Sequence, residues 1–116
     1  MMADETPKQT HNELYRLIRD DDMDTFNARR GKGEACDMRG LDFRGQDLRR
    51  MDAVGIDFSN SYFRQADLRG LNLSACRLEG ASIHGAKISG VYFPKELSPV
   101  EIRLSLEFGT RMRYGA

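Results

Sequence analysis

The sequence is poor in the residues from which catalytic and metal sites are built. Its 116 residues include two histidines, two cysteines and no tryptophan. With His11 and His84 alone, a histidine-based metal cluster is not available. The serines have no base and oxyanion partner in a recognisable pattern, and residues 31–33 lack the rest of a phosphate-binding loop. We therefore expect a protein that is not an enzyme and binds no cofactor.

The acidic run at residues 20–24 also fails as a calcium site. Counted from Asp20, position six of the loop is Thr25 rather than glycine, and position twelve is Gly31 rather than glutamate. We expect an acidic turn between two helices here.

Charge and hydropathy give no sign of a membrane or nucleic-acid partner. Lys+Arg and Asp+Glu both number 18, so the formal net charge is zero and general attraction to polyanions is not expected. No apolar stretch approaches the length of a membrane span, and residues 1–13 lack the apolar core of a signal peptide. Two cysteines are also fewer than a small disulfide-stapled secreted domain usually carries. We expect a cytoplasmic protein.

Residues 36–95 consist of twelve five-residue repeats in unbroken register. The third position of every repeat is apolar, the first is apolar in ten of twelve, the second is Asp six times, and the fifth is Gly seven times. Apart from Ala53, the third-position residues predicted to form the core are Met38, Phe43, Leu48, Phe58, Phe63, Leu68, Leu73, Leu78, Ile83, Ile88 and Phe93.

A period of five fits neither a helix nor a straight strand. At about 100° per residue, third-position side chains would scatter around a helix, and an odd period would alternate them between the two faces of a strand. The period instead predicts a chain that turns a corner every five residues, with first and third positions inside and second and fourth positions outside. Glycine suits the corner because corners often need a positive φ.

This pattern resembles the pentapeptide-repeat family, whose motif is A-(D/N)-L-x-x. The resemblance implies a β-class fold, a right-handed quadrilateral β-helix with four repeats per coil. Twelve repeats then give three coils, with an N-terminal tail and helical cap at 1–35, the β-helix at 36–95 and a C-terminal cap at 96–116. Cys36 and Cys76 would lie two coils apart, roughly 9–10 Å, which exceeds the reach of a disulfide of about 7 Å.

Stacking places residues twenty apart above one another and predicts two candidate surfaces. A basic face would comprise Arg44, Arg49, Arg64 and Arg69, which either pairs with the neighbouring aspartates or binds an acidic partner. The fourth face carries the fewest charges, and its Val54 and Tyr92 are candidates for a side-on protein contact.

The segments that flank the repeats are predicted to close the tube. Helical spacing at 11–30, with Asp22 as an N-cap, predicts a helical hairpin. Residues 98–109 are open to two interpretations, since alternation from Val100 to Phe108 suggests a strand, whereas the capping box at Ser98 and Gly109 at the other end favour a helix. As a helix, Val100, Leu104 and Phe108 would cap the tube and leave Ile102 and Leu106 for a second copy.

These features favour a protein-interaction or scaffold module that forms a homodimer and binds a further, unidentified protein. The resemblance also implies an alternative, since some pentapeptide-repeat proteins mimic DNA and modulate type II topoisomerases. Zero net charge and three coils disfavour that alternative, and an excess of two positive charges in the repeats makes nucleic acid a poor candidate partner.

Overall fold

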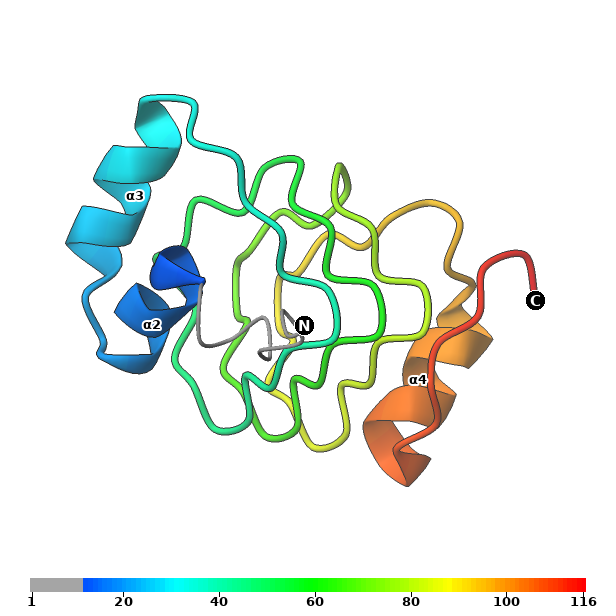
Figure 1. Ribbon diagram of the computed structural model, residues 1–116. Helices are drawn as coiled ribbons and strands as arrows, with labels where there is room; N and C mark the ends of the chain where they lie inside the picture. The colour runs from blue at the N-terminus through cyan, green and yellow to red at the C-terminus, as the bar shows by residue number, and fades with distance from the viewer. Residues whose placement is uncertain (1–11) are drawn as a thin grey trace, which may run out of the picture.

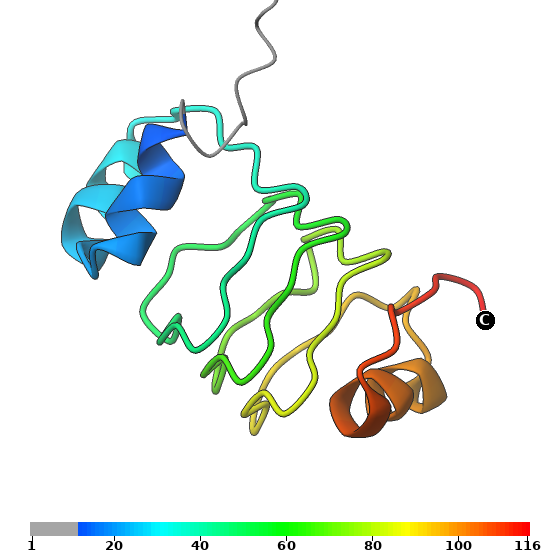
Figure 2. The ribbon, with the colours of Figure 1, turned by 60° about the horizontal axis from the view of Figure 1, so that its bottom comes forward.

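The computed structural model describes residues 12–116; residues 1–11, the N-terminal tail and the start of the predicted hairpin, lie outside the described part. The chain runs from α2 (Glu13–Arg19) and α3 (Met23–Gly31) through the repeats to α4 (Pro99–Phe108). Figures 1 and 2 show α2 and α3 at one end of the stacked repeats and α4 at the other. Within the described residues, no helix is long and apolar enough to traverse a bilayer.

The repeats wind into three stacked coils, residues 36–55, 56–75 and 76–95, which we call the repeat tube. Parallel bridges join residues twenty apart, for example Asp42 to Tyr62 and Tyr62 to Ser82. Backbone hydrogen bonds repeat the register, since Phe43 N donates to Tyr62 O at 2.7 Å and Phe63 N donates to Ser82 O at 2.7 Å. Each coil therefore consumes four five-residue repeats.

The expected β-class fold is wrong. Pairing within residues 12–116 is limited to seven isolated bridges, no strand or sheet forms there, and the regular elements are three helices. The reason lies in the period itself. A turn follows each pairing residue, and most of these turns are closed by a hydrogen bond, such as that from Gln46 N to Phe43 O at 3.1 Å. Two consecutive described residues therefore never pair as they must in a strand.

The turns explain the aspartate and glycine positions of the repeat. A second-position Asp or Asn accepts a hydrogen bond from the backbone N–H two residues later, as Asp47 does from Arg49 at 3.2 Å, which is the usual role of Asx residues in turns. The fifth position often has a positive φ, and at Gly80 a Cβ atom would also lie 2.0 Å from Asn60 Oδ1. Glycine is favoured there by conformation, and any larger residue would also require the Asn60 side chain to move.

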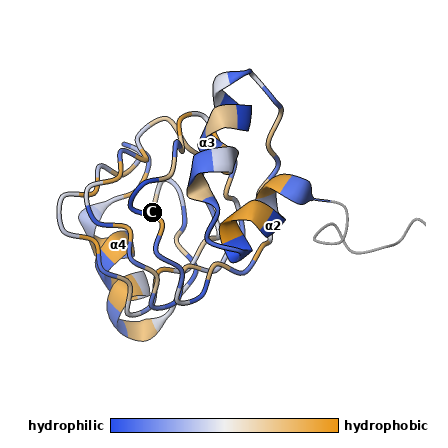
Figure 3. Cartoon of the chain, turned by 90° about the vertical axis from the view of Figure 1, so that its left-hand side faces the viewer, coloured by the Kyte–Doolittle hydropathy of each residue, from blue (hydrophilic) through white to orange (hydrophobic). Residues whose placement is uncertain are grey.

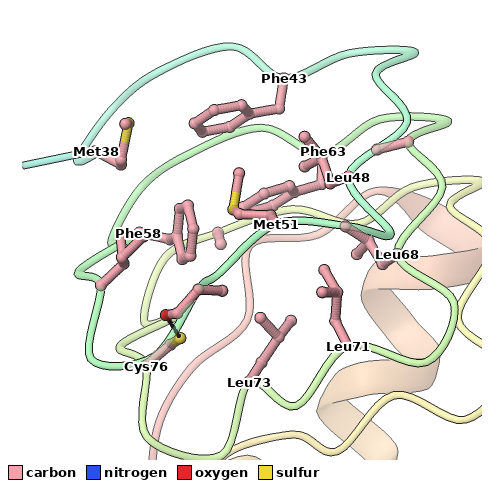
Figure 4. Packing of buried hydrophobic residues seen from close by; sticks show 14 of the residues in the cluster. Met38, Phe43, Leu48, Met51, Phe58, Phe63, Leu68, Leu71, Leu73 and Cys76 are labelled. Carbon is pink, nitrogen blue, oxygen red and sulfur yellow. Dashed lines mark hydrogen bonds between the residues drawn. The ribbon is translucent and has the colours of Figure 1, made fainter. Parts of the chain in front are cut away.

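The interior of the tube is filled by the first- and third-position side chains (Figure 4). Phe63 stacks on Phe43 with ring centroids 5.1 Å apart, and both rings meet Phe58 edge to face. The predicted core residues are buried, apart from Ile88 and Phe93, which are partly buried. The core is therefore less completely covered in the last repeats.

Ser61 is a polar exception within this interior. It occupies an inward first position and has no exposed surface. Its hydroxyl accepts from Leu41 N at 3.2 Å and donates to Met38 O at 2.5 Å. It thereby replaces the direct turn hydrogen bond that other corners of the tube make.

The N-terminal helices close the first coil through side chains. Asn12 and Asp22 cap α2 and α3, which confirms Asp22 as the predicted N-cap, and Phe26 is fully buried. Four side chains bond the outer backbone of the first coil: Asn12 to Asp37 O, Tyr15 to Asp42 O, Asn27 to Arg50 O and Arg30 to Val54 O, at 2.6–2.8 Å.

The helical interpretation of the C-terminal segment is confirmed. Ser98 is the N-cap of α4 and accepts from Glu101 N, Pro99 begins the helix, and Gly109 ends it in the left-handed conformation. The segment closes the third coil by accepting hydrogen bonds from four backbone N–H groups of that coil. These bonds run from Leu78 N to Tyr114 Oη, Gly80 N to Met112 O, Ile83 N to Ser105 Oγ and Gly85 N to Leu106 O.

Candidate functional site

Two of the four predicted basic-face arginines are neutralised by their neighbours. The Arg49 guanidinium bonds Asp47 at 2.8–2.9 Å and lies 3.4 Å from Asp67, and Arg69 bonds Asp67 at 2.7–2.9 Å. The hydrogen bonds from Arg69, with help from Arg49, hold the pKa of the Asp67 carboxyl well below its usual range. This side of the tube therefore presents paired charges.

The other two arginines have weaker or no partners. Arg44 lies 3.4 Å from Asp42, and the Arg64 guanidinium makes no hydrogen bond or ion pair with any residue in 12–116. Together with Tyr62 these residues line an open hollow of about 300 Å³, which we call the Tyr62 hollow. The structure thus divides the predicted basic face into a neutral part and a part with excess positive charge.

A residue from the far end of the sequence contacts Tyr62 beside the hollow, although it does not line the hollow itself. Arg111 lies over the Tyr62 ring, with its guanidinium carbon 4.9 Å from the ring centroid. It also donates hydrogen bonds to the Tyr62 hydroxyl and to Gly80 O. No pattern in the sequence links Arg111 to this site, because 49 residues separate it from Tyr62 and it lies outside the repeats.

The side of α4 that faces the tube is the reverse of the one expected. Ile102 and Leu106 are partly buried and pack against the core, whereas Val100 and Phe108 are 66% and 71% exposed. The expectation was wrong because two polar residues are the most deeply buried on α4. Ser105 bonds Ile83 N at 2.9 Å, and Glu101 binds Arg113 at 2.7 Å.

Glu101 holds the C-terminal segment to the helix. Its carboxylate accepts hydrogen bonds from both the side chain and the backbone N–H of Arg113. These bonds lower the pKa of Glu101, the side-chain bond most strongly. A charged Glu101 is thus part of the cap that closes the third coil.

The outward side of α4 carries an apolar stripe in which Val100 and Phe108 are exposed and Leu104 is partly buried. Val100, Leu104 and Phe108 recur every four residues, flanked by Arg103 and Glu107, and line a hollow of about 350 Å³. Apolar residues along α4 appear orange in Figure 3. We call Val100, Leu104 and Phe108 the α4 outer face.

The remaining candidate residues lie apart from α4. Val54 and Tyr92, from the fourth side of the tube, are 63% and 68% exposed.

Both cysteines are free, as expected from their separation. Burial raises the pKa of the Cys36 thiol to about 11 and also raises that of Cys76. The described residues contain no group of three side chains suited to a metal ion.

The stacked five-residue register and its two end caps define a repeat protein, in which each unit contacts its neighbours along one axis. The sequence model described as Pentapeptide repeats matches residues 56–93 in eight copies. The chain is a pentapeptide-repeat protein. The match covers the second and third coils, and the structure places residues 36–55 in the same register. No curated protein and no solved structure matches the chain.

Proposed function

We propose that this protein is a non-enzymatic interaction module that forms a homodimer through the α4 outer face. The observation that carries the proposal is the stripe of Val100, Leu104 and Phe108 on a helix whose opposite side packs against the tube. A helix with apolar residues on two sides rarely leaves one of them in water. The repeat tube would act as a rigid base that presents this helix.

A second copy fits this face because the face is self-complementary. Leu104 is the middle of the stripe, so a two-fold axis beside it would set Val100 against Phe108 of the other copy. The same operation would bring Arg103 near Glu107 of the other copy. These two residues already form an i,i+4 pair within α4, with Arg103 Nε and Glu107 Oε2 3.7 Å apart. An antiparallel helix pair therefore combines apolar contact with matched charges.

We further propose that the module works in the cytoplasm. Its two cysteines are unpaired, and thiols remain reduced in that compartment. The DNA-mimic alternative gains no support from the side of the tube that carries Arg49 and Arg69, because its carboxylates are neutralised by arginines.

Light scattering over a range of concentrations tests the homodimer. The wild type should approach the dimer mass at micromolar concentrations, and Leu104→Asp should remain a folded monomer. Ile102→Asp is the matched control, since it places the same charge on the inner side of α4 and should destabilise the cap instead. A wild-type monomer at high micromolar concentration would rule out the homodimer.

A further inference from the structure

The Tyr62 hollow differs from the neighbouring side of the tube in one sequence position. In the third and seventh repeats the second position is Asp, and each Asp pairs with the Arg two residues later. In the sixth repeat the second position is Tyr62, so Arg64 has no carboxylate in its own repeat. The replacement removes a negative charge and adds an aromatic ring that is 41% exposed.

The surrounding residues increase the positive charge instead of compensating for it. Arg111 adds a third guanidinium above the Tyr62 ring, and its partners among residues 12–116 are all neutral, namely Tyr62, Gly80 O and Asn60 Oδ1. Asp42 is the one carboxylate that lines the hollow, and its contact with Arg44 is 3.4 Å long. Counting the two arginines that line the hollow and Arg111 on the Tyr62 ring beside it, three arginines surround one carboxylate, an excess of two positive charges.

We propose that the Tyr62 hollow binds carboxylate side chains of an acidic segment of a partner protein. This proposal rests on the interaction function proposed above. It adds the chemistry of the protein partner that would bind besides a second copy of the chain. Arg44 and Arg64 lie on adjacent coils, whose spacing is about 4.7–4.9 Å, so their guanidinium groups converge on the same small region. Guanidinium groups bind carboxylates through paired, parallel hydrogen bonds.

The size of the charge excess favours an acidic peptide over nucleic acid. Nucleic-acid affinity grows with the number of phosphates that are neutralised, and the hollow can neutralise about two. On the adjoining side of the tube Asp47 and Asp67 are paired with Arg49 and Arg69, so that side has no excess positive charge to attract a continuing phosphate backbone. A short peptide with two or three carboxylates matches the local charge and needs no contact with that side.

A fluorescein-labelled peptide of six glutamates, followed by fluorescence anisotropy, is a suitable probe. The wild type should bind it at low salt, and binding should weaken towards 1 M salt, where the screening length falls to about 3 Å. Arg64→Ala should weaken binding at least about tenfold. Arg69→Ala, which removes the same charge from the same position of the next repeat, should change binding less than about twofold.

Tyr62→Asp gives a second and independent test. It retains every arginine but supplies Arg64 with the carboxylate that Arg69 already has in Asp67. It should weaken binding as much as Arg64→Ala, and circular dichroism would show that the variant is folded. Equal losses in Arg64→Ala and Arg69→Ala would show general charge attraction and overturn the proposal.

Two further outcomes would also overturn the proposal. One is the absence of peptide binding by the folded wild type at low salt. The other is tighter binding of a single-stranded oligonucleotide of equal charge, which would assign the hollow to nucleic acid. Light scattering of Arg64→Ala separates this proposal from the homodimer. If the variant loses peptide binding but remains a dimer, the loss is due to the hollow and not to a change in assembly.

Discussion

Replacing Phe63 with alanine should remove a large packing contribution from the middle coil. The side chain is 2% exposed, its ring stacks on Phe43 at 5.1 Å, and it meets the edge of Phe58 at 5.3 Å. Truncation of a buried phenylalanine costs about 3–5 kcal/mol, because transfer energy is lost and a cavity remains. A domain has only about 5–15 kcal/mol of stability in total, so the loss would be a large part of it.

Urea unfolding followed by circular dichroism measures this loss. With a slope near 2 kcal/mol per molar urea, the midpoint should fall by about 1.5–2.5 M. Tyr92→Ala is the matched control, since it removes an aromatic ring that is 68% exposed, and it should change stability by less than about 0.5 kcal/mol. A loss below about 1 kcal/mol for Phe63→Ala would refute the twenty-residue register, because the ring would then lie outside the core.

Three further predictions concern the polar and sulfur groups of the tube. Ser61→Ala should cost about 1–3 kcal/mol in urea unfolding, because it leaves two buried backbone groups of the first coil without a partner. Arg113 lowers the pKa of Glu101 in the folded state. The ion pair between them therefore contributes its full stability above the pKa of an unfolded glutamate, near 4.3, and this stability is lost as pH falls through the folded pKa. Glu101→Gln should therefore flatten the fall in melting temperature below about pH 4. Cys36 and Cys76 should react slowly with a thiol reagent in the native protein and rapidly in urea, since burial raises both pKa values.

The five-residue period of the tube could be predicted from sequence because it depends on side-chain type. The four repeats per coil came from the family resemblance, and the bridge from Asp42 to Tyr62 lies at the twenty-residue separation that the resemblance implied. The class of secondary structure could not be predicted in the same way. Strand formation depends on consecutive backbone pairs, and the corner after each repeat prevents them.

The predicted orientation of α4 is wrong, and the physical reason is a different one. The pattern was interpreted by placing apolar residues inside, yet Glu101 and Ser105 are the most deeply buried residues of the helix. The open end of a coil exposes backbone N–H groups, and a polar side chain such as Ser105 satisfies one of them. Hydrogen bonding to the open backbone N–H groups therefore determines which side of α4 faces the tube, and the burial of its apolar residues follows from that.

The Tyr62 hollow was visible in part from the sequence. The stacking rule placed Arg44 above Arg64, and it placed Arg49 and Arg69 beside Asp47 and Asp67. The contribution of Arg111 depends on the path of the chain after Gly109, where no repeat fixes the register. That contact follows from tertiary structure alone.

Cross-linking of Leu104→Cys across the homodimer tests the central proposal most directly. An antiparallel α4 pair centred on Leu104 brings the two copies of this residue face to face, so mild oxidation should convert most of the protein to a disulfide-linked dimer. Tyr92→Cys is the control, because it introduces a thiol at a highly exposed position outside α4, and it should cross-link slowly. If Leu104→Cys cross-links no faster than Tyr92→Cys, the α4 outer face does not join two copies of the chain.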